Sequence, residues 1–336
     1  MRRLRPRPSA GSDPLAEVLT PSAEDRLYLS SLHDESVPLP AGAEHELRRG
    51  NTRLRELRRH YAALDLPVTR ASRWDPEAIE SFLDLRWFRG ETLITWHYRE
   101  LPRVTRLKYF VLLEYVLERD ELGLLESLDE DGAFGCWTYE YPGRPKVSRD
   151  LLDSVNEISF LERHLGLSRR PGVRVLDIGA GYGRLAHRMC SGLSNLKDYC
   201  CVDAIAESTF VCEYYLRYRG CSPPARVVSL DRVQQELRPG SFDLALNVHS
   251  FSECPLEAVA WWVDELVRLA PQWLLVVPNE PEKMLSLEPD GSRRNFLPLL
   301  EAAGYALHAR EPVLDDPAVA ELLRHDDHFH LFRRAG

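Results

Sequence analysis

An acidic residue followed by three alternating glycines is the segment of this chain whose residue types best suit ligand binding. Asp177 lies near the end of the apolar run 173–178, and Gly179, Gly181 and Gly183 follow it. A helical pattern begins directly afterwards, which predicts a buried parallel strand, a tight turn and the start of a helix. Glycines permit positive φ angles and leave no Cβ between the backbone and a ligand. The alternative is a tight turn that binds nothing, but the strand and helix around it favour a binding site.

The spacing of the glycines and the position of Asp177 indicate which ligand the turn would hold. A dinucleotide-binding turn has the spacing G-x-G-x-x-G and presents a helix N-terminus to a pyrophosphate. Here the spacing is G-x-G-x-G, and the Asp177 carboxylate would repel a pyrophosphate but favour an ammonium group. S-adenosyl-L-methionine has that ammonium group, a sulfonium and no phosphate. We therefore expect the turn, Ala180 included, to bind S-adenosyl-L-methionine.

A second carboxylate, Asp203, ends the next predicted strand, 20 residues after Gly183. A carboxylate in that place can accept hydrogen bonds from both ribose hydroxyls of the cofactor. The alternative is an aspartate that only caps the following helix.

Polar side chains also lie at the end of the fourth predicted strand, 242–248, and directly after it. Asn247 and His249 alternate with apolar residues, and Ser250 and Glu253 come next. An acceptor hydroxyl must lose a proton as its oxygen attacks a methyl carbon, and histidine titrates near neutral pH. We expect His249 to be the general base, Glu253 to orient it and Asn247 to contact the cofactor. The alternative is that His249 only packs or binds a backbone carbonyl.

From residue 173 onward, apolar runs alternate with helical patterns, as a doubly wound α/β fold requires. The predicted strands are 173–178, 198–203, 225–230, 242–248, 272–278, 305–310 and 327–333. In such a Rossmann-like sheet the ligand lies outside the carboxyl ends of the strands, where the strand order reverses. The fold is therefore expected to gather the residues that follow these strand ends.

The chain is predicted to divide into four segments. Residues 1–40, rich in Pro, Ser and charge, are expected to be a mobile tail, and residues 41–133 a helical N-terminal domain. Residues 134–172 are expected to form a short β-hairpin and a helix, capped by Ser148, that cover the active site. Residues 173–336 then form the cofactor-binding domain.

Candidate acceptor-binding side chains lie in the hairpin and in the capped helix. Tyr139 and Tyr141 alternate with other residues in the hairpin, and they either line an acceptor pocket or cover the core. Asn156 and Glu157 lie off the main apolar stripe of the helix, where they face either a pocket or solvent.

The histidine- and aspartate-rich run 325–330 raises the question of a metal site. The run continues as a predicted strand, and alternation places His328 and His330 on one face. No full set of metal ligands is visible, so no metal is expected. We predict instead that these two histidines lie at the mouth of the pocket and contact the acceptor.

Composition and charge exclude several classes of function. The chain has 336 residues, of which 44% are hydrophobic, and a net charge of −9, which argues against a nucleic-acid-binding surface. No apolar run reaches the roughly 20 residues of a membrane helix, and the arginine-rich start lacks the apolar core of a secretory signal. The seven cysteines include no CxxC pair, so we expect reduced thiols and a cytoplasmic protein.

Motif-level resemblances extend this interpretation. Residues 176–183, Leu-Asp-Ile-Gly-Ala-Gly-Tyr-Gly, resemble motif I of class I S-adenosylmethionine-dependent methyltransferases. Residues 177–185, together with 148–158 and 247–253, resemble the sugar O-methyltransferase family of antibiotic gene clusters, of the nanchangmycin type. The resemblance covers about residues 134–336, and Ala180 stands where that family would have a glycine.

The resemblance implies a seven-stranded methyltransferase sheet in the order 3-2-1-4-5-7-6, with the last strand reversed. It implies that Asp231 holds the adenine edge, although Asp231 could also only cap a helix. The implied activity is methyl transfer to a hydroxyl of a small-molecule acceptor, a sugar or a glycosylated natural product. The alternatives are a non-sugar acceptor, such as a polyketide hydroxyl or a peptide carboxylate, and a non-catalytic partner protein. Whether the chain forms a homo-oligomer stays open.

Overall fold

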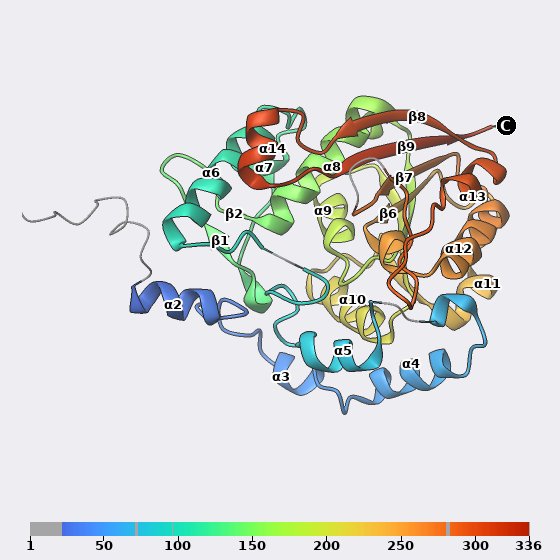
Figure 1. Cartoon of the computed structure of the whole chain (residues 1–336), viewed down its shortest axis with the longest axis horizontal. Helices are drawn as coiled ribbons and strands as arrows, with labels where there is room; N and C mark the ends of the chain where they lie inside the picture. Colours follow the sequence, from blue (N-terminus) through green and yellow to red (C-terminus); the bar gives the residue numbers. More distant parts are fainter. Residues whose placement is uncertain (1–21, 71–72, 96, 280–282, 336) are drawn as a thin grey trace, which may run out of the picture.

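A seven-stranded sheet forms the centre of the structure, a computed structural model that describes residues 22–70, 73–95, 97–279 and 283–335 (Figure 1). Its strands are β3 (Val173–Ile178), β4 (Leu196–Asp203), β5 (Ala225–Ser229), β6 (Leu244–Val248), β7 (Trp273–Val277), β8 (Tyr305–Pro312) and β9 (His328–Arg334). They lie in the order β5-β4-β3-β6-β7-β9-β8, which is 3-2-1-4-5-7-6 when the strands are numbered from β3. The pairs are parallel except those that β9 makes with β7 and β8.

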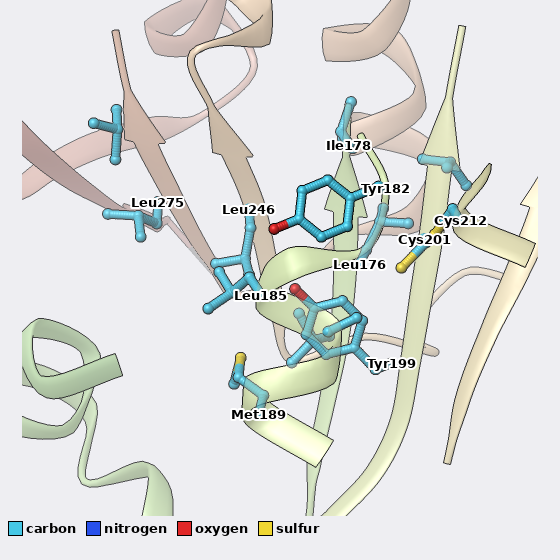
Figure 2. Close-up of a cluster of buried hydrophobic side chains, with 14 of the residues drawn as sticks. Leu176, Ile178, Tyr182, Leu185, Met189, Tyr199, Cys201, Cys212, Leu246 and Leu275 are labelled. Carbon is cyan, nitrogen blue, oxygen red and sulfur yellow. The ribbon is translucent and has the colours of Figure 1, made fainter. Parts of the chain in front are cut away.

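The strands form where the sequence predicts them because the central ones are buried on both faces and read as continuous apolar runs. The expected strand 173–178 has the bounds of β3, and the other predicted strands begin and end within two residues of the observed ones. Figure 2 shows the packing on one face of β3, where Tyr182 and Leu185 of the turn and the following helix lie close to Leu176 and Tyr199.

Helices connect and cover these strands. They are α8 (Arg149–Leu165), α9 (Arg184–Gly192), α10 (Ala206–Tyr218), α11 (Val233–Glu236), α12 (Leu256–Leu269), α13 (Leu297–Ala302) and α14 (Pro317–Leu323). The predicted cap of α8 is confirmed, since the Ser148 hydroxyl accepts a hydrogen bond from the Leu151 N–H at 3.1 Å. In the described part of the chain, no helix is both long enough and apolar enough to cross a membrane.

The residues before the sheet are mainly helical. Their elements are α2 (Ala23–Ser30), α3 (Ala43–Glu46), α4 (Thr52–Ala62), η1 (Pro67–Thr69), α5 (Pro76–Phe82), α6 (Pro102–Leu117), α7 (Leu124–Ser127) and η2 (Ala133–Gly135). The predicted hairpin is a two-stranded antiparallel ribbon of β1 (Thr138–Tyr139) and β2 (Val147–Ser148). In Figure 1, α4 and α5 run along the side of the molecule opposite β8 and β9.

Part of the segment expected to be a mobile tail is packed against the rest of the chain. The Asp34 N–H donates to the Gly135 carbonyl at 3.1 Å, and the His33 ring stacks on Trp87 with centroids 4.7 Å apart. These contacts join 22–40 to residues far away in the sequence, and the mobility expected for 1–40 stays a prediction. The rest of the predicted tail, 1–21, lies outside the described residues.

A buried ionic network links the N-terminal helices to the sheet. Arg89 is fully buried and contacts Glu130 at 2.7 Å and Asp150 at 2.9 Å. Asp150 also accepts a hydrogen bond from the hydroxyl of Tyr182, within the glycine turn, and Arg188 of α9 contacts Glu130 at 2.6 Å. The apolar core likewise runs without interruption from α3 to β9. The N-terminal segment and the sheet thus share one interior.

Candidate active site

A cavity of about 1090 Å³ lies at the carboxyl ends of β3, β4 and β6. The strand ends contribute Asp177, Asp203 and His249, and the glycine turn contributes its backbone. The N-terminal segment and α8 supply other walls, among them α4, η1, residues 73, 74 and 76 and residues 92–95. The cavity thus lies at the topological switch point of the sheet, the place where the sequence predicts a ligand.

The glycine turn after β3 is shaped by both backbone conformation and crowding. Gly179 and Gly181 have φ angles of 77° and 58°. A Cβ on Gly179 would lie 2.2 Å from the Ser250 hydroxyl, and one on Gly181 would lie 2.9 Å from the Ile94 side chain. Side chains other than hydrogen are therefore disfavoured at both positions, and the backbone of the turn borders the cavity directly.

Two carboxylates of the cavity wall, Asp177 and Glu157, are buried. Asp177 accepts a hydrogen bond from the Tyr199 hydroxyl at 2.8 Å, but burial outweighs this bond and raises the pKa of Asp177 to about 6. Glu157 Oε1 contacts Arg184 at 2.7 Å, while its Oε2 is buried with no hydrogen-bond partner, and burial raises the pKa of Glu157. Such carboxylates suit a cationic ligand, because a positive charge beside them favours their ionised form.

Asp203 lies at the end of β4 and holds the turn as well as bordering the cavity. Its Oδ2 accepts from the Gly181 N–H at 3.0 Å and its Oδ1 from the Ile205 N–H at 2.8 Å. Burial outweighs these bonds and raises the pKa of Asp203 to about 7. Each carboxylate oxygen can accept a further hydrogen bond, so the local capping role and a role in binding hydroxyl groups are compatible.

The carboxylate beside His249 is Asp327, not the expected Glu253. His249 Nε2 lies 3.4 Å from Asp327 Oδ2. Glu253 instead accepts hydrogen bonds from the Trp74 indole at 2.7 Å and from Arg73 at 2.8 Å. The expected pairing of Glu253 with His249 is therefore wrong, because Glu253 connects the residues after β6 to the N-terminal segment. His249, Asp327 and Glu253 all border the cavity.

Two predicted cofactor contacts lie away from the cavity. Asn247 is fully buried, and its amide donates to the Ile178 carbonyl at 2.9 Å and to the Ser250 hydroxyl at 2.5 Å, which ties β6 to the end of β3. Asp231 faces His60 at 3.2 Å. Neither residue borders the cavity, so the structure does not support the predicted contacts. Asn247 instead binds the backbone of the neighbouring strand, while Val248 and His249 both border the cavity.

Three of the four predicted acceptor contacts in the hairpin and α8 also lie elsewhere. Tyr139 stacks on Tyr109 with centroids 4.0 Å apart, and the Tyr141 hydroxyl donates to the Arg106 carbonyl at 2.5 Å. The amide of Asn156 donates to the Val313 carbonyl at 2.9 Å. These three side chains stabilise packing between elements and do not border the cavity, whereas the fourth, Glu157, does.

The histidine-rich run reaches the cavity through other residues than predicted. His328 Nδ1 lies 3.0 Å from the Asp326 carbonyl and His330 is buried in β9, and neither borders the cavity. His325 and Asp327, just before β9, do border it. Among the described residues, no group of His, Cys, Asp and Glu side chains has an arrangement that could hold a metal ion.

Comparisons with known proteins return structures only. No protein-family model and no curated protein sequence matches the chain. The [4+2]-cyclase SpnF is 20% identical, with a TM-score of 0.41 over 68% of this chain and 94% of its own. A geranyl diphosphate methyltransferase in complex with SAM is 15% identical, with a TM-score of 0.39 over 55% and 86%. An S-adenosylmethionine-dependent methyltransferase from Mesorhizobium loti is 17% identical, with a TM-score of 0.38 over 53% and 98%.

Proposed function

We propose that this protein is an S-adenosyl-L-methionine-dependent methyltransferase that acts on a hydroxyl group of a sugar or glycosylated natural product. One observation carries the proposal. A glycine turn with a buried carboxylate, a second carboxylate at the next strand end and an imidazole at a third strand end all border a single cavity.

The residues of the cavity fit the cofactor. The unpartnered Glu157 oxygen and the raised pKa values of Asp177 and Asp203 mark a site where a cation relieves the cost of buried negative charge. Asp177 and Glu157 would hold the ammonium group, Asp203 the ribose hydroxyls, and the backbone of Gly179–Gly181 the nucleoside. When bound, the cofactor supplies an electrophilic methyl group, and its sulfur keeps the electron pair of the bond that breaks.

The size of the cavity leaves room for an acceptor. Pockets for one small molecule measure about 300–1000 Å³, and this cavity is larger. His249 lies at the end of β6, where it can take the proton of an acceptor hydroxyl. The walls carry many hydrogen-bonding side chains, which suits an acceptor rich in hydroxyl groups. Most of the rate enhancement then comes from positioning, worth up to about 7–11 kcal/mol in favourable cases.

Calorimetry of the purified full chain tests cofactor binding. We expect binding of S-adenosyl-L-methionine and of its demethylated product, and no binding of NADH. The variant Asp203→Asn should weaken binding about tenfold or more, because a ribose acceptor is lost. Asp231→Asn is the matched control and should stay within about twofold of the wild type. Failure to bind either cofactor form, or binding of NADH in their place, would overturn the proposal.

Transfer of a labelled methyl group tests the acceptor class. The full chain is incubated with labelled cofactor and a panel of nucleotide-sugars, glycosylated aglycones, unglycosylated polyketides and peptides. Label in a sugar hydroxyl supports the proposed acceptor. Label only in a polyketide or in a peptide carboxylate would support methyltransferase activity but would contradict the proposed sugar acceptor.

A further inference from the structure

Two imidazoles flank one carboxylate in the cavity wall. Asp327 Oδ2 lies 3.4 Å from His249 Nε2 and 3.5 Å from His325 Nε2. The His249 side chain is 30% exposed and that of His325 is 8% exposed, so His249 is the imidazole open to a ligand. The side of His325 away from Asp327 faces positive charge, because its Nδ1 lies 3.4 Å from Arg149 Nη2.

The charges around Asp327 determine which of these groups is ionised. Burial opposes ionisation of Asp327, but the hydrogen bond and charge of His249, with His325 and Arg149 nearby, outweigh it and lower its pKa. Burial and then the charge of Arg149 lower the pKa of His325, which favours its neutral form. Glu157 of α8 and Asp153 also lie within electrostatic reach of the two histidines. Asp327 is thus a carboxylate whose exposed partner is His249.

The backbone holds both members of this pair in place. His249 has a φ angle of 67°, a conformation that is unfavourable for a non-glycine residue, and its N–H donates to the Val277 carbonyl at 2.7 Å. The carbonyl of Asp327 accepts from the Val313 N–H at 2.8 Å. Strain of this kind persists where the surrounding structure fixes a side chain in one orientation.

We propose that Asp327 is the positioning residue for the general base His249. Its carboxylate accepts from Nε2–H and fixes that tautomer of the neutral ring, which leaves Nδ1 as the nitrogen that takes the acceptor's proton. This inference rests on the proposed function. The proton passes from the acceptor oxygen to Nδ1, and the electron pair of the O–H bond stays on that oxygen, which forms the new bond to carbon. The imidazolium is stabilised by Asp327 and later returns the proton to solvent.

The tautomer of His249 tests the proposal without any acceptor. The full chain is labelled with ¹⁵N-histidine, and the His249 signals are assigned by their absence in His249→Gln. In the wild type, two-bond ¹H–¹⁵N correlations should show neutral His249 as the Nε2–H form. In Asp327→Asn that form should lose its majority, because an amide can donate to Nε2 as well as accept from it.

Matched controls separate this effect from a general change in charge. Asp326→Asn makes the same substitution one residue away, and Glu253→Gln changes the carboxylate first expected to orient His249; neither should move the tautomer. A wild-type spectrum with Nδ1–H as the main form, or the same tautomer in Asp327→Asn, would overturn the proposal. Since the wild-type spectrum decides by itself, a variant that fails to fold does not remove the test.

Cofactor binding distinguishes the failure of this inference from the failure of the proposed function. Asp327→Asn should bind S-adenosyl-L-methionine within about threefold of the wild type, while kcat falls about 10²-fold or more and KM for the acceptor changes little. If the wild type does not bind the cofactor, the proposed function fails, whatever the tautomer. If it binds the cofactor and transfers methyl groups but Asp327→Asn keeps wild-type kcat, only the role of Asp327 fails.

Discussion

The carboxylates at the ends of β3 and β4 hold their protons more tightly than exposed ones. Burial raises the pKa of Asp177 to about 6 and that of Asp203 to about 7, because there is little water to solvate their charge. His249, at the end of β6, is more exposed than these carboxylates, and its Nε2 lies 3.4 Å from Asp327 Oδ2. The residues of the cavity therefore divide into a part that suits a cation and a part that suits proton removal.

Replacing the His249 imidazole tests the proposed role of His249 in proton removal. His249→Ala should lower kcat about 10²- to 10⁴-fold, the usual contribution of a general base, and leave cofactor affinity within about twofold. Steady-state kinetics with calorimetry of the same preparation would show this. Wild-type turnover at saturating acceptor would mean that His249 is not the base.

The pH dependence of stability tests whether Asp177 is a buried carboxylate with a raised pKa. The pKa of Asp177 is raised from 3.8 to about 6 in the folded state, so the ligand-free protein binds this proton more tightly than the unfolded chain does. The stability that results is present below pH 3.8 and is lost as pH rises through 6. The melting temperature of Asp177→Asn minus that of the wild type should therefore increase as the pH rises from 4.5 to 7.5. A melting-temperature difference that does not change over this range would contradict the assignment.

The turn between β3 and α9 is the element that connects fold and site. Its glycines have positive φ, its Gly181 N–H is held by Asp203, and its Tyr182 reaches the buried Asp150 through its hydroxyl. The turn is thus fixed from both sides, which keeps its backbone at the cavity wall. Asn247 adds a third connection, through the Ile178 carbonyl at the end of β3.

Two glycine variants separate crowding at this turn from backbone strain. Gly181→Ala places a Cβ 2.9 Å from Ile94 at φ 58°, while Gly220→Ala meets nothing within 4 Å at a similar φ of 65°. Both should lose about 1–2 kcal/mol of stability through positive φ. Only Gly181→Ala should also weaken S-adenosyl-L-methionine binding, by about tenfold, as calorimetry would measure. Equal loss of affinity in both would show that the turn is not the binding surface.

At the scale of the whole molecule, the N-terminal segment is part of the interior that supports the site. Its Arg89 lies between Glu130 and Asp150, its Trp74 and Arg73 bind Glu253, and its α4 and η1 form cavity walls. A charge buried this deeply is costly when its partner is lost, so the ionic network makes the two parts of the chain depend on each other.

Arginine variants measure that dependence. Arg89→Ala leaves two buried carboxylates without their shared cation and should lower the free energy of unfolding by about 3–5 kcal/mol. Arg86→Ala removes an arginine that is 48% exposed and should cost less than about 1 kcal/mol. Denaturant unfolding of both variants would check this. A small effect of Arg89→Ala would mean that the N-terminal segment is not energetically coupled to the sheet.

The sequence by itself determined the features that depend on neighbouring residues. Continuous apolar runs predicted the strands, and Ser148 predicted the start of α8. Asp177, Asp203 and His249 could be predicted to lie near one another because each lies at or next to the carboxyl end of its own strand, and all three border the cavity. Only the tertiary structure decided which polar groups meet. Asn247 binds the backbone of β3 and not the cavity, and Asp327, which lies near the C-terminal end of the chain, contacts His249. These partners could not be predicted because side-chain contacts depend on tertiary packing and not on spacing along the sequence.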